Sequence, residues 1–243
     1  MNEMRENVHR KAAAPSLLPA KAPHGGLEKC TKDAGVHRRP WTPEALIAAG
    51  DRKNLPVWVT HDEAHAVFNA AESARDRLFA WTLWVTGARV SEAIGIAACD
   101  FDRSTRTLRL RRLKKRSGPV DASVPGLPEE FCQLLHTYIQ SAGLKGRARL
   151  FAFNRFRAWR IIKALMAKAG IEPVYRTTKT GKRIDLKRHP HAWRHGFAIN
   201  LLNQGKPLVA VQELLGHESM LSTYVYVRAL AANVRPFMET TTF

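Results

Sequence analysis

The segment spanning residues 189–227 constrains the fold of this chain more than any other stretch. Apolar residues recur there at helical spacing, first from Phe197 onward and then across residues 208–215. Between the two patterns stand Gly205, which suits a helix end, and Pro207, which suits a helix start. The sequence therefore predicts two helices joined by a tight turn.

Polar side chains gather at the ends of these two expected helices. His191 and Arg194 stand at the start of the first helix, His217 follows the second, and Tyr224 and Tyr226 come shortly after. A guanidinium can fork onto two phosphate oxygens, and an imidazole can exchange protons near neutral pH. Cations and imidazoles beside a phenol indicate a phosphodiester that is attacked by tyrosine.

Two spaced motifs carry a resemblance to a known family. The pattern H-x-x-R, then L-G-H, then a tyrosine nine positions after that histidine is similar to the second signature box of the tyrosine recombinase (phage integrase) family. The first box of that family, T-G-x-R-x-S-E, is matched by residues 86–92. The resemblance covers roughly residues 56–230 and implies these catalytic residues: Arg89, Lys114, His191, Arg194, His217 and Tyr226.

The resemblance also implies a mechanism. Tyr226 would attack a DNA phosphodiester and form a 3′-phosphotyrosyl bond, which a 5′-hydroxyl of another duplex would then resolve. Arg89 and Arg194 would bind the phosphate, and Glu92 would orient Arg89. Lys114 would protonate the departing 5′-oxygen. The bond energy stays in the linkage, so ATP is not needed. The resemblance implies no metal or other cofactor.

The position of the lysine follows from an expected β-hairpin. A strand over residues 107–113 can pair with one over residues 120–124 across a basic turn. The family's catalytic lysine lies where the first strand ends. Lys114 fits that position best, and Lys115 is the alternative.

Two further residues near the second box need an assignment. Tyr226 has the family spacing, so Tyr224 is expected to pack against the protein instead of reacting. His195 follows Arg194 directly and matches no catalytic position. It is expected to pack within the helix or to lie at the edge of a phosphate site.

The charge balance favours a polyanionic partner. Lys plus Arg number 39 against 21 for Asp plus Glu, which gives a net charge of +18. A solvated basic surface or an acidic membrane would be the alternative readings, but the cations are clustered as in nucleic-acid-binding proteins. The candidate DNA contacts are Arg109, Arg111, Arg112, Lys115, Arg116, Arg155 and Arg157.

Composition along the chain predicts the domain organisation. Residues 1–55 are basic and rich in Pro and Ala, and we expect an extension that is largely disordered or forms a short helix. Residues 56–243 are expected to form the catalytic domain, mainly α-helical with a small antiparallel β hairpin or sheet. Residues 228–243 would dock on a neighbouring subunit, because the resemblance implies a homotetramer on two DNA duplexes. Trp193 stands where the family usually has Leu.

The lengths of the apolar segments indicate where in the cell the protein is located. The longest mostly apolar run, residues 78–85, is too short to span a bilayer. The first residues contain no apolar core of a signal peptide. We expect a cytoplasmic, nucleoid-associated protein that does not engage a membrane.

Other functions are compatible with parts of the sequence. His61 and His65 have a metal-ligand spacing, but the zincin pattern needs Glu directly after the first His, and a helix start with the capping box Thr60–Glu63 explains the stretch better. A type IB topoisomerase shares the tyrosine chemistry, and a DNA-binding regulator could keep the fold without activity. Integration, excision, inversion and plasmid multimer resolution remain open as biological roles.

Overall fold

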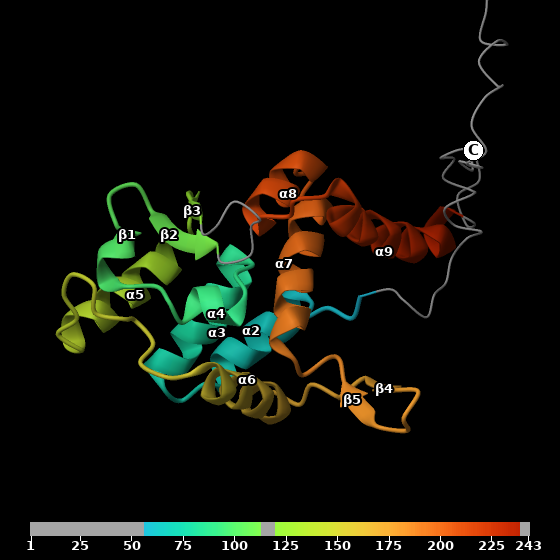
Figure 1. The fold of residues 1–243 in the computed structure, drawn as a ribbon, viewed down its shortest axis with the longest axis horizontal. Coiled ribbons are helices and arrows are strands. Elements are labelled where there is room, and N and C mark those ends of the chain that lie inside the picture. The colour runs from blue at the N-terminus through green and yellow to red at the C-terminus, as the bar shows by residue number, and fades with distance from the viewer. Residues whose placement is uncertain (1–55, 113–119, 239–243) are drawn as a thin grey trace, which may run out of the picture. The chain divides into compact units, whose positions relative to one another are not determined.

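The computed structural model describes residues 56–112 and 120–238 (Figure 1). The predicted extension over residues 1–55 lies outside them, and so do Lys114, Lys115 and Arg116. The described elements, in order, are α2 (His61–Ala70), α3 (Ala74–Thr86), α4 (Val90–Ala93), the 3-10 turn η2 (Ala98–Asp100), β1 (Phe101–Asp102), β2 (Thr107–Arg112), β3 (Val120–Val124), α5 (Glu129–Ser141), α6 (Arg155–Lys168), β4 (Tyr175–Thr177), β5 (Arg183–Asp185), α7 (Pro190–Asn203), α8 (Leu208–Leu215) and α9 (Met220–Met238).

The first helices begin and end where local chemistry predicts. The amide of Glu63 donates to Thr60 Oγ1 at 3.3 Å and the Glu63 carboxylate accepts from the Thr60 amide at 2.7 Å, so the predicted capping box starts α2. Helix α3 ends at Gly87, whose φ of 57° is left-handed. A Cβ at Gly87 would also lie 2.3 Å from the ring of Phe197 in α7. Glycine is therefore required here both for backbone conformation and for close packing.

The predicted hairpin forms, and its side chains alternate between core and solvent. Strands β2 and β3 are antiparallel, with Leu108 opposite Val124 and Arg112 opposite Val120, and β1 pairs along the other edge of β2. Along β2 the buried positions are Leu108, Leu110 and Arg112. The arginine therefore lies on the same face as the two leucines, which turn toward the core.

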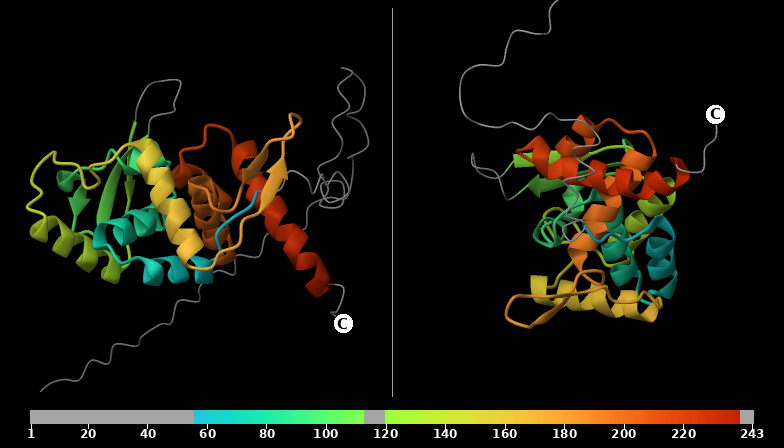
Figure 2. Two further views of the ribbon diagram at one scale, coloured as in Figure 1. Left: turned by 90° about the horizontal axis from the view of Figure 1, so that it is seen from below. Right: turned by 90° about the vertical axis from the view of Figure 1, so that its right-hand side faces the viewer.

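Two apolar clusters meet along α7. The larger one joins α2, α3, α5 and α6 and includes Trp193 of α7. The smaller one is made by Phe197, Val211, Leu215 and Tyr226, from α7, α8 and α9. Helix α7 thus packs against α3 on one side and against α8 and α9 on the other, as the views from two further sides show (Figure 2).

The start of α7 is fixed by segments on both sides of it. Strands β4 and β5 form a second hairpin, and Asp185 Oδ1 then accepts hydrogen bonds from the amides of Lys187 and Arg188. The Val59 amide donates to the carbonyl of Ala192 at 3.0 Å, so the segment entering the fold lies along α7.

Within the described residues, no helix combines the length and apolarity needed to cross a membrane.

Candidate active site

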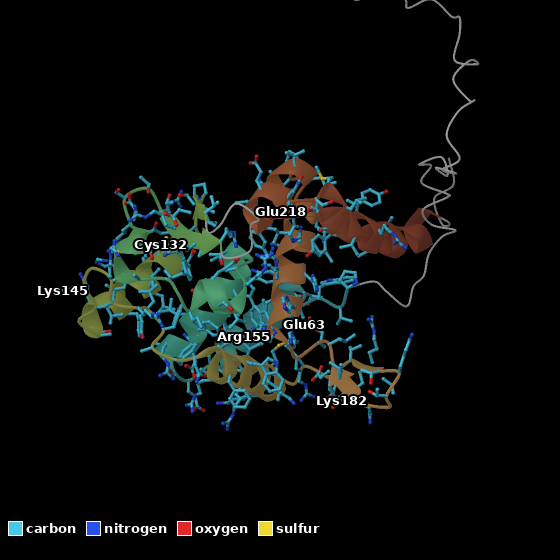
Figure 3. The ribbon with its side chains drawn as sticks, in the orientation of Figure 1. Glu63, Cys132, Lys145, Arg155, Lys182 and Glu218 are labelled. Carbon is cyan, nitrogen blue, oxygen red and sulfur yellow. The ribbon has the colours of Figure 1, made fainter. Side chains whose placement is uncertain are left out.

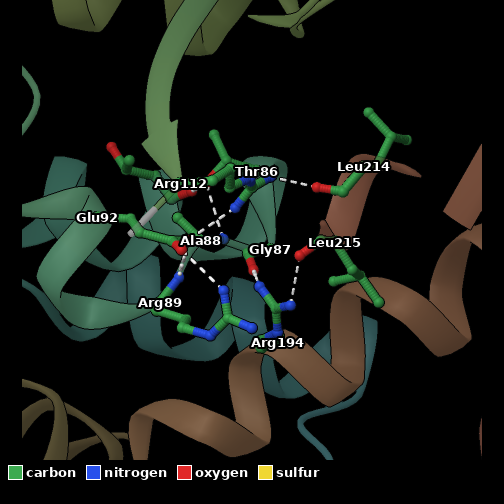
Figure 4. Close-up of polar contacts among 10 residues, drawn as sticks. Thr86, Gly87, Ala88, Arg89, Glu92, Arg112, Arg194, Leu214 and Leu215 are labelled. Carbon is green, nitrogen blue, oxygen red and sulfur yellow. Dashed lines mark hydrogen bonds and ion pairs between the residues drawn. The ribbon is translucent and has the colours of Figure 1, made fainter. Parts of the chain in front are cut away.

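Glu92 is the buried anion around which the arginines are arranged. Its side chain is fully buried and accepts from Arg89 Nη1 at 2.8 Å and from Arg112 Nη1 at 2.8 Å (Figure 4). It also accepts the Arg89 amide at 2.9 Å. Burial pushes the pKa of Glu92 upward, but the Arg89 amide and the Arg112 charge outweigh this, and the pKa is lowered from 4.5. An ionised carboxylate is thus available to orient both guanidinium groups at neutral pH.

Arg112 does not occupy the surface position that we predicted for it. Its side chain is only 2% exposed, and Nη2 donates to the carbonyl of Leu214 at the end of α8. The prediction of a DNA contact was wrong because the strand alternation turns Arg112 toward the core with Leu108 and Leu110. Arg112 links the hairpin to α8 instead.

Arg194 is held in place by two carbonyl groups. Its Nη1 donates to the Gly87 carbonyl at 2.7 Å and its Nη2 to the Leu215 carbonyl at 2.5 Å. Burial lowers the pKa of Arg194 from 12.5 to about 10, so the group stays charged at neutral pH. A guanidinium has five N–H donors, so three remain for an incoming anion. The two carbonyls therefore fix the group and occupy only two of its five donors.

Tyr226 lies among two imidazoles and the two catalytic arginine candidates. Its side chain is 2% exposed, and its hydroxyl lies 3.1 Å from His195 Nδ1. The ring of His217 is nearly parallel to the phenol, with centroids 6.3 Å apart. Burial raises the pKa of Tyr226, while the charges of Arg194 and Arg89 act in the opposite direction. The phenol therefore keeps its proton at neutral pH until a partner removes it.

The two catalytic histidine candidates have different neighbours. His217 Nδ1 lies 2.8 Å from Thr223 Oγ1, and burial, followed by the charges of Arg194 and Arg89, lowers its pKa to about 4. The amide of His191 donates to His189 Nδ1, and desolvation followed by nearby cations lowers the His191 pKa. Both rings are neutral at pH 7 in the absence of a bound anion.

His195 is the residue that sequence reasoning underestimated. It contacts the hydroxyl of Tyr226, whereas we expected it to pack or to line a phosphate site. Its spacing of four from His191 on one helix was the available signal, because such residues share a face. That face borders a pocket of about 420 Å³, which is also lined by His189, His191, Asp185 and Val225.

Of the remaining predicted residues, some lie outside the described chain, and Arg155 is near enough to the cluster for its charge to lower the pKa of His191. Tyr224 is half-buried on α9. Arg109 and Arg111 are exposed on β2, and Arg109 donates to the Cys99 carbonyl at 2.6 Å. Arg155 and Arg157 are exposed in the first turn of α6, where Figure 3 labels Arg155. In the described part of the chain, no group of three metal-ligating side chains accompanies the His61–His65 pair.

Comparison with known proteins gives a consistent set of relatives. The model of the phage integrase family matches residues 57–233. The tyrosine recombinase XerD of Corynebacterium glutamicum is 31% identical over 170 residues, covering 66% of this chain and 50% of the relative. This chain therefore spans about half the length of that relative.

Solved structures share the architecture. The crystal structure of XerA recombinase has a TM-score of 0.59 at 25% identity and covers 78% of this chain and 67% of that one. The catalytic domain of bacteriophage HP1 integrase has a TM-score of 0.52 at 18% identity, covers 77% of this chain and 99% of that one, and shows a common fold. The expected mainly helical fold with small antiparallel β elements is confirmed.

Proposed function

Because this chain belongs to the phage integrase family, we propose that it cuts and rejoins DNA through a phosphotyrosyl intermediate on Tyr226. The observation that carries the proposal is the convergence on one phenol of two imidazoles and two guanidinium groups. His195 and His217 contact or face Tyr226, and the charges of Arg194 and Arg89 act on it. A buried phenol beside fixed cations suits attack on an anionic phosphodiester.

The arginines would bind the non-bridging oxygens of the phosphate that is attacked. Arg194 is anchored by two carbonyls and Arg89 by Glu92, so both are oriented before the DNA arrives. Fixed donors stabilise the charge that develops in the transition state without reorganising. Losing one such donor typically costs on the order of 3 kcal/mol, or roughly a hundredfold in rate.

The covalent step conserves the bond that it breaks. The Tyr226 oxygen would form a bond to phosphorus as the bond from phosphorus to the 5′-oxygen breaks. Lys114, with Lys115 as the alternative, would supply the proton to that oxygen, and both lie outside the described residues. The reverse attack by a 5′-hydroxyl would release the tyrosine. This scheme uses no metal and no ATP.

The partner in this proposal is double-stranded DNA carrying a specific recombination site. Structures of two related proteins, XerH and the Tn1549 integrase, were solved with DNA. A homotetramer on two duplexes, with residues 56–243 as the catalytic domain and 228–243 as a docking segment, completes the proposal. Exposed Arg109, Arg111, Arg155 and Arg157 would contact the DNA backbone.

A covalent trap tests the proposal directly. Nicked suicide duplexes from the DNA that flanks the protein's own gene would be incubated with the protein in EDTA, and protein–DNA adducts resolved on denaturing gels. We expect an adduct with the wild type and with Tyr224→Phe, and none with Tyr226→Phe. DNA binding without any adduct would favour a non-catalytic regulator. Relaxation of supercoils on DNA that lacks a defined site would favour a type IB topoisomerase.

A further inference from the structure

The polar environment of the Tyr226 hydroxyl singles out one imidazole. His195 Nδ1 lies 3.1 Å from that oxygen. His217 stacks beside the phenol, but its Nδ1 is engaged with Thr223 Oγ1 at 2.8 Å. Within the described residues, His195 is the one titratable side chain whose hydrogen bond reaches the hydroxyl of Tyr226.

The charge state of His195 allows it to accept a hydrogen bond from the phenol. Burial, followed by the nearby His191 and Arg194, lowers the pKa of His195 to about 4, so the ring is neutral at pH 7. A neutral imidazole has one N–H and one lone pair. Since the buried phenol keeps its proton, the hydroxyl can donate to Nδ1 when His195 carries its proton on Nε2.

We propose that His195 receives the phenolic proton of Tyr226 as the phenol oxygen attacks phosphorus. The inference rests on the proposed function and assigns the catalytic base within it. As the bond between oxygen and phosphorus forms, the O–H electrons stay on oxygen and the proton passes to Nδ1. The separate acid supplies the 5′-oxygen with its proton. In the reverse step, the imidazolium returns the proton to the departing phenolate.

The surroundings of His195 explain how an imidazolium could be tolerated there. A bound phosphate would add negative charge near Arg194 and so offset the cation that disfavours protonation of His195. Asp185 also lines the 420 Å³ pocket that His195 borders, and its charge acts on His189. The rings of His191 and His195 have centroids 6.5 Å apart, and those of His189 and His191 are 5.3 Å apart. This row of imidazoles leads from the phenol along the pocket.

The decisive variant is His195→Asn. The amide oxygen of Asn can accept a hydrogen bond close to the position of Nδ1, but it cannot take a proton at neutral pH. His65→Asn, the same change on the exposed side of α2, is the matched control. Single-turnover cleavage would be measured on the suicide duplex and on the same duplex with sulfur in place of the bridging 5′-oxygen. A thiolate leaves without needing a proton, so that substrate bypasses the acid.

We expect His195→Asn to slow cleavage roughly 10²–10⁴-fold on both substrates, which is the usual loss when a general base is removed. Cleavage at the wild-type rate would show that His195 only positions the phenol, and rescue by the sulfur substrate would show that it serves the leaving group. Either result overturns the inference but leaves the proposed function standing. A wild type that forms no adduct rejects both.

A second measurement is independent of catalysis and does not need the His195 variant. Nitrogen-15 NMR of histidine-labelled wild-type protein without DNA reports which ring nitrogen carries the proton. We expect His195 to be protonated on Nε2, with an Nδ1 resonance that shifts in Tyr226→Phe. A proton on Nδ1, or an Nδ1 resonance unaffected by the loss of the phenol, would contradict the inference.

Discussion

Arg112 Nη1 and Glu92 Oε2 lie 2.8 Å apart in the interior, although 20 positions separate the two residues in the chain. The same carboxylate binds Arg89 through its other oxygen. Because Arg112 also donates to the Leu214 carbonyl, one side chain connects the hairpin, the arginine of the first motif and the end of α8. Arg112 therefore holds the carboxylate that orients Arg89 and connects it to the end of α8.

Arg112→Met tests this connection. Removing one member of a buried ion pair leaves the other charge poorly compensated and typically costs about 3–5 kcal/mol. We expect a loss of that order in the free energy of unfolding, measured by urea denaturation, and a parallel loss of covalent adduct. Arg111→Met, the same change on the exposed face of β2, is the control and should change stability little. Equal effects of the two substitutions would refute the role given to Arg112.

Gly196→Ala tests the contact between α7 and the segment that enters the fold. A Cβ at Gly196 would lie 2.3 Å from the Val59 carbonyl oxygen and 2.9 Å from Trp84. Relieving that overlap must move backbone, so we expect the free energy of unfolding to fall by about 1–3 kcal/mol or more. Asn200→Ala, one turn further along α7 at a half-buried position, controls for the composition of the helix. A thermal midpoint for Gly196→Ala that equals the wild type would count against this packing.

The depressed histidine pKa values predict how stability depends on pH. The pKa of His195 and that of His217 fall from 6.5 to about 4 on folding. Between these values the unfolded chain binds more protons than the folded one, so stability decreases as pH drops from 6.5 toward 4. Glu92, whose pKa is lowered from 4.5, adds its own loss only as pH falls further.

Urea unfolding near neutral pH and at about pH 5 measures this slope. His195→Asn and His217→Asn should each flatten it by up to about one proton, because Asn does not titrate. His65→Asn, at an exposed position, should leave the contribution of the buried pair intact. A slope that survives in the double variant His195→Asn/His217→Asn would assign the acid sensitivity to other groups.

The salt dependence of DNA binding tests the arginines of α6. If Arg155 and Arg157 each neutralise one phosphate, the logarithm of the DNA-binding constant should fall less steeply with the logarithm of salt concentration when either is replaced by Ala. The magnitude of the slope should decrease by about 0.9. Lys168→Ala removes the same charge from the last turn of α6, where Lys168 is paired with Glu72. That control should leave the slope nearly unchanged. Fluorescence anisotropy over a range of salt concentrations gives the slopes of the wild type and of the three variants.

Local chemistry carried most of the fold prediction. The capping box at Thr60 and the hairpin strands each depend on residues a few positions apart, and both were predicted correctly. The same period-two alternation that located β2 also puts Arg112 on the buried face. We predicted a DNA contact for Arg112 from its positive charge and did not apply the strand alternation to it. Partners for a buried arginine, however, come from elements that only the folded chain brings together.

In the candidate site, too, the sequence predicted some residues, and the folded chain was needed to find a contact between others. The spacing of the two motifs identified Arg89, Arg194, His217 and Tyr226, which the fold brings together. The contact of His195 with Tyr226 joins α7 to α9 across 31 positions, and no pattern along the chain specifies that distance. Helical spacing could place His195 on the same face as His191, but it could not say which imidazole meets the phenol.

The entering segment also has a mechanical consequence. Residues 56–60 are bonded to α7 through the Val59 amide, and Lys187, just before α7, donates to the Trp58 carbonyl at 2.5 Å. Tension applied to the chain on the N-terminal side of residue 56 would therefore load α7 before it reached α2. Helix α7, which carries His191 and Arg194, would bear that tension first, and the resulting strain would fall within the candidate site.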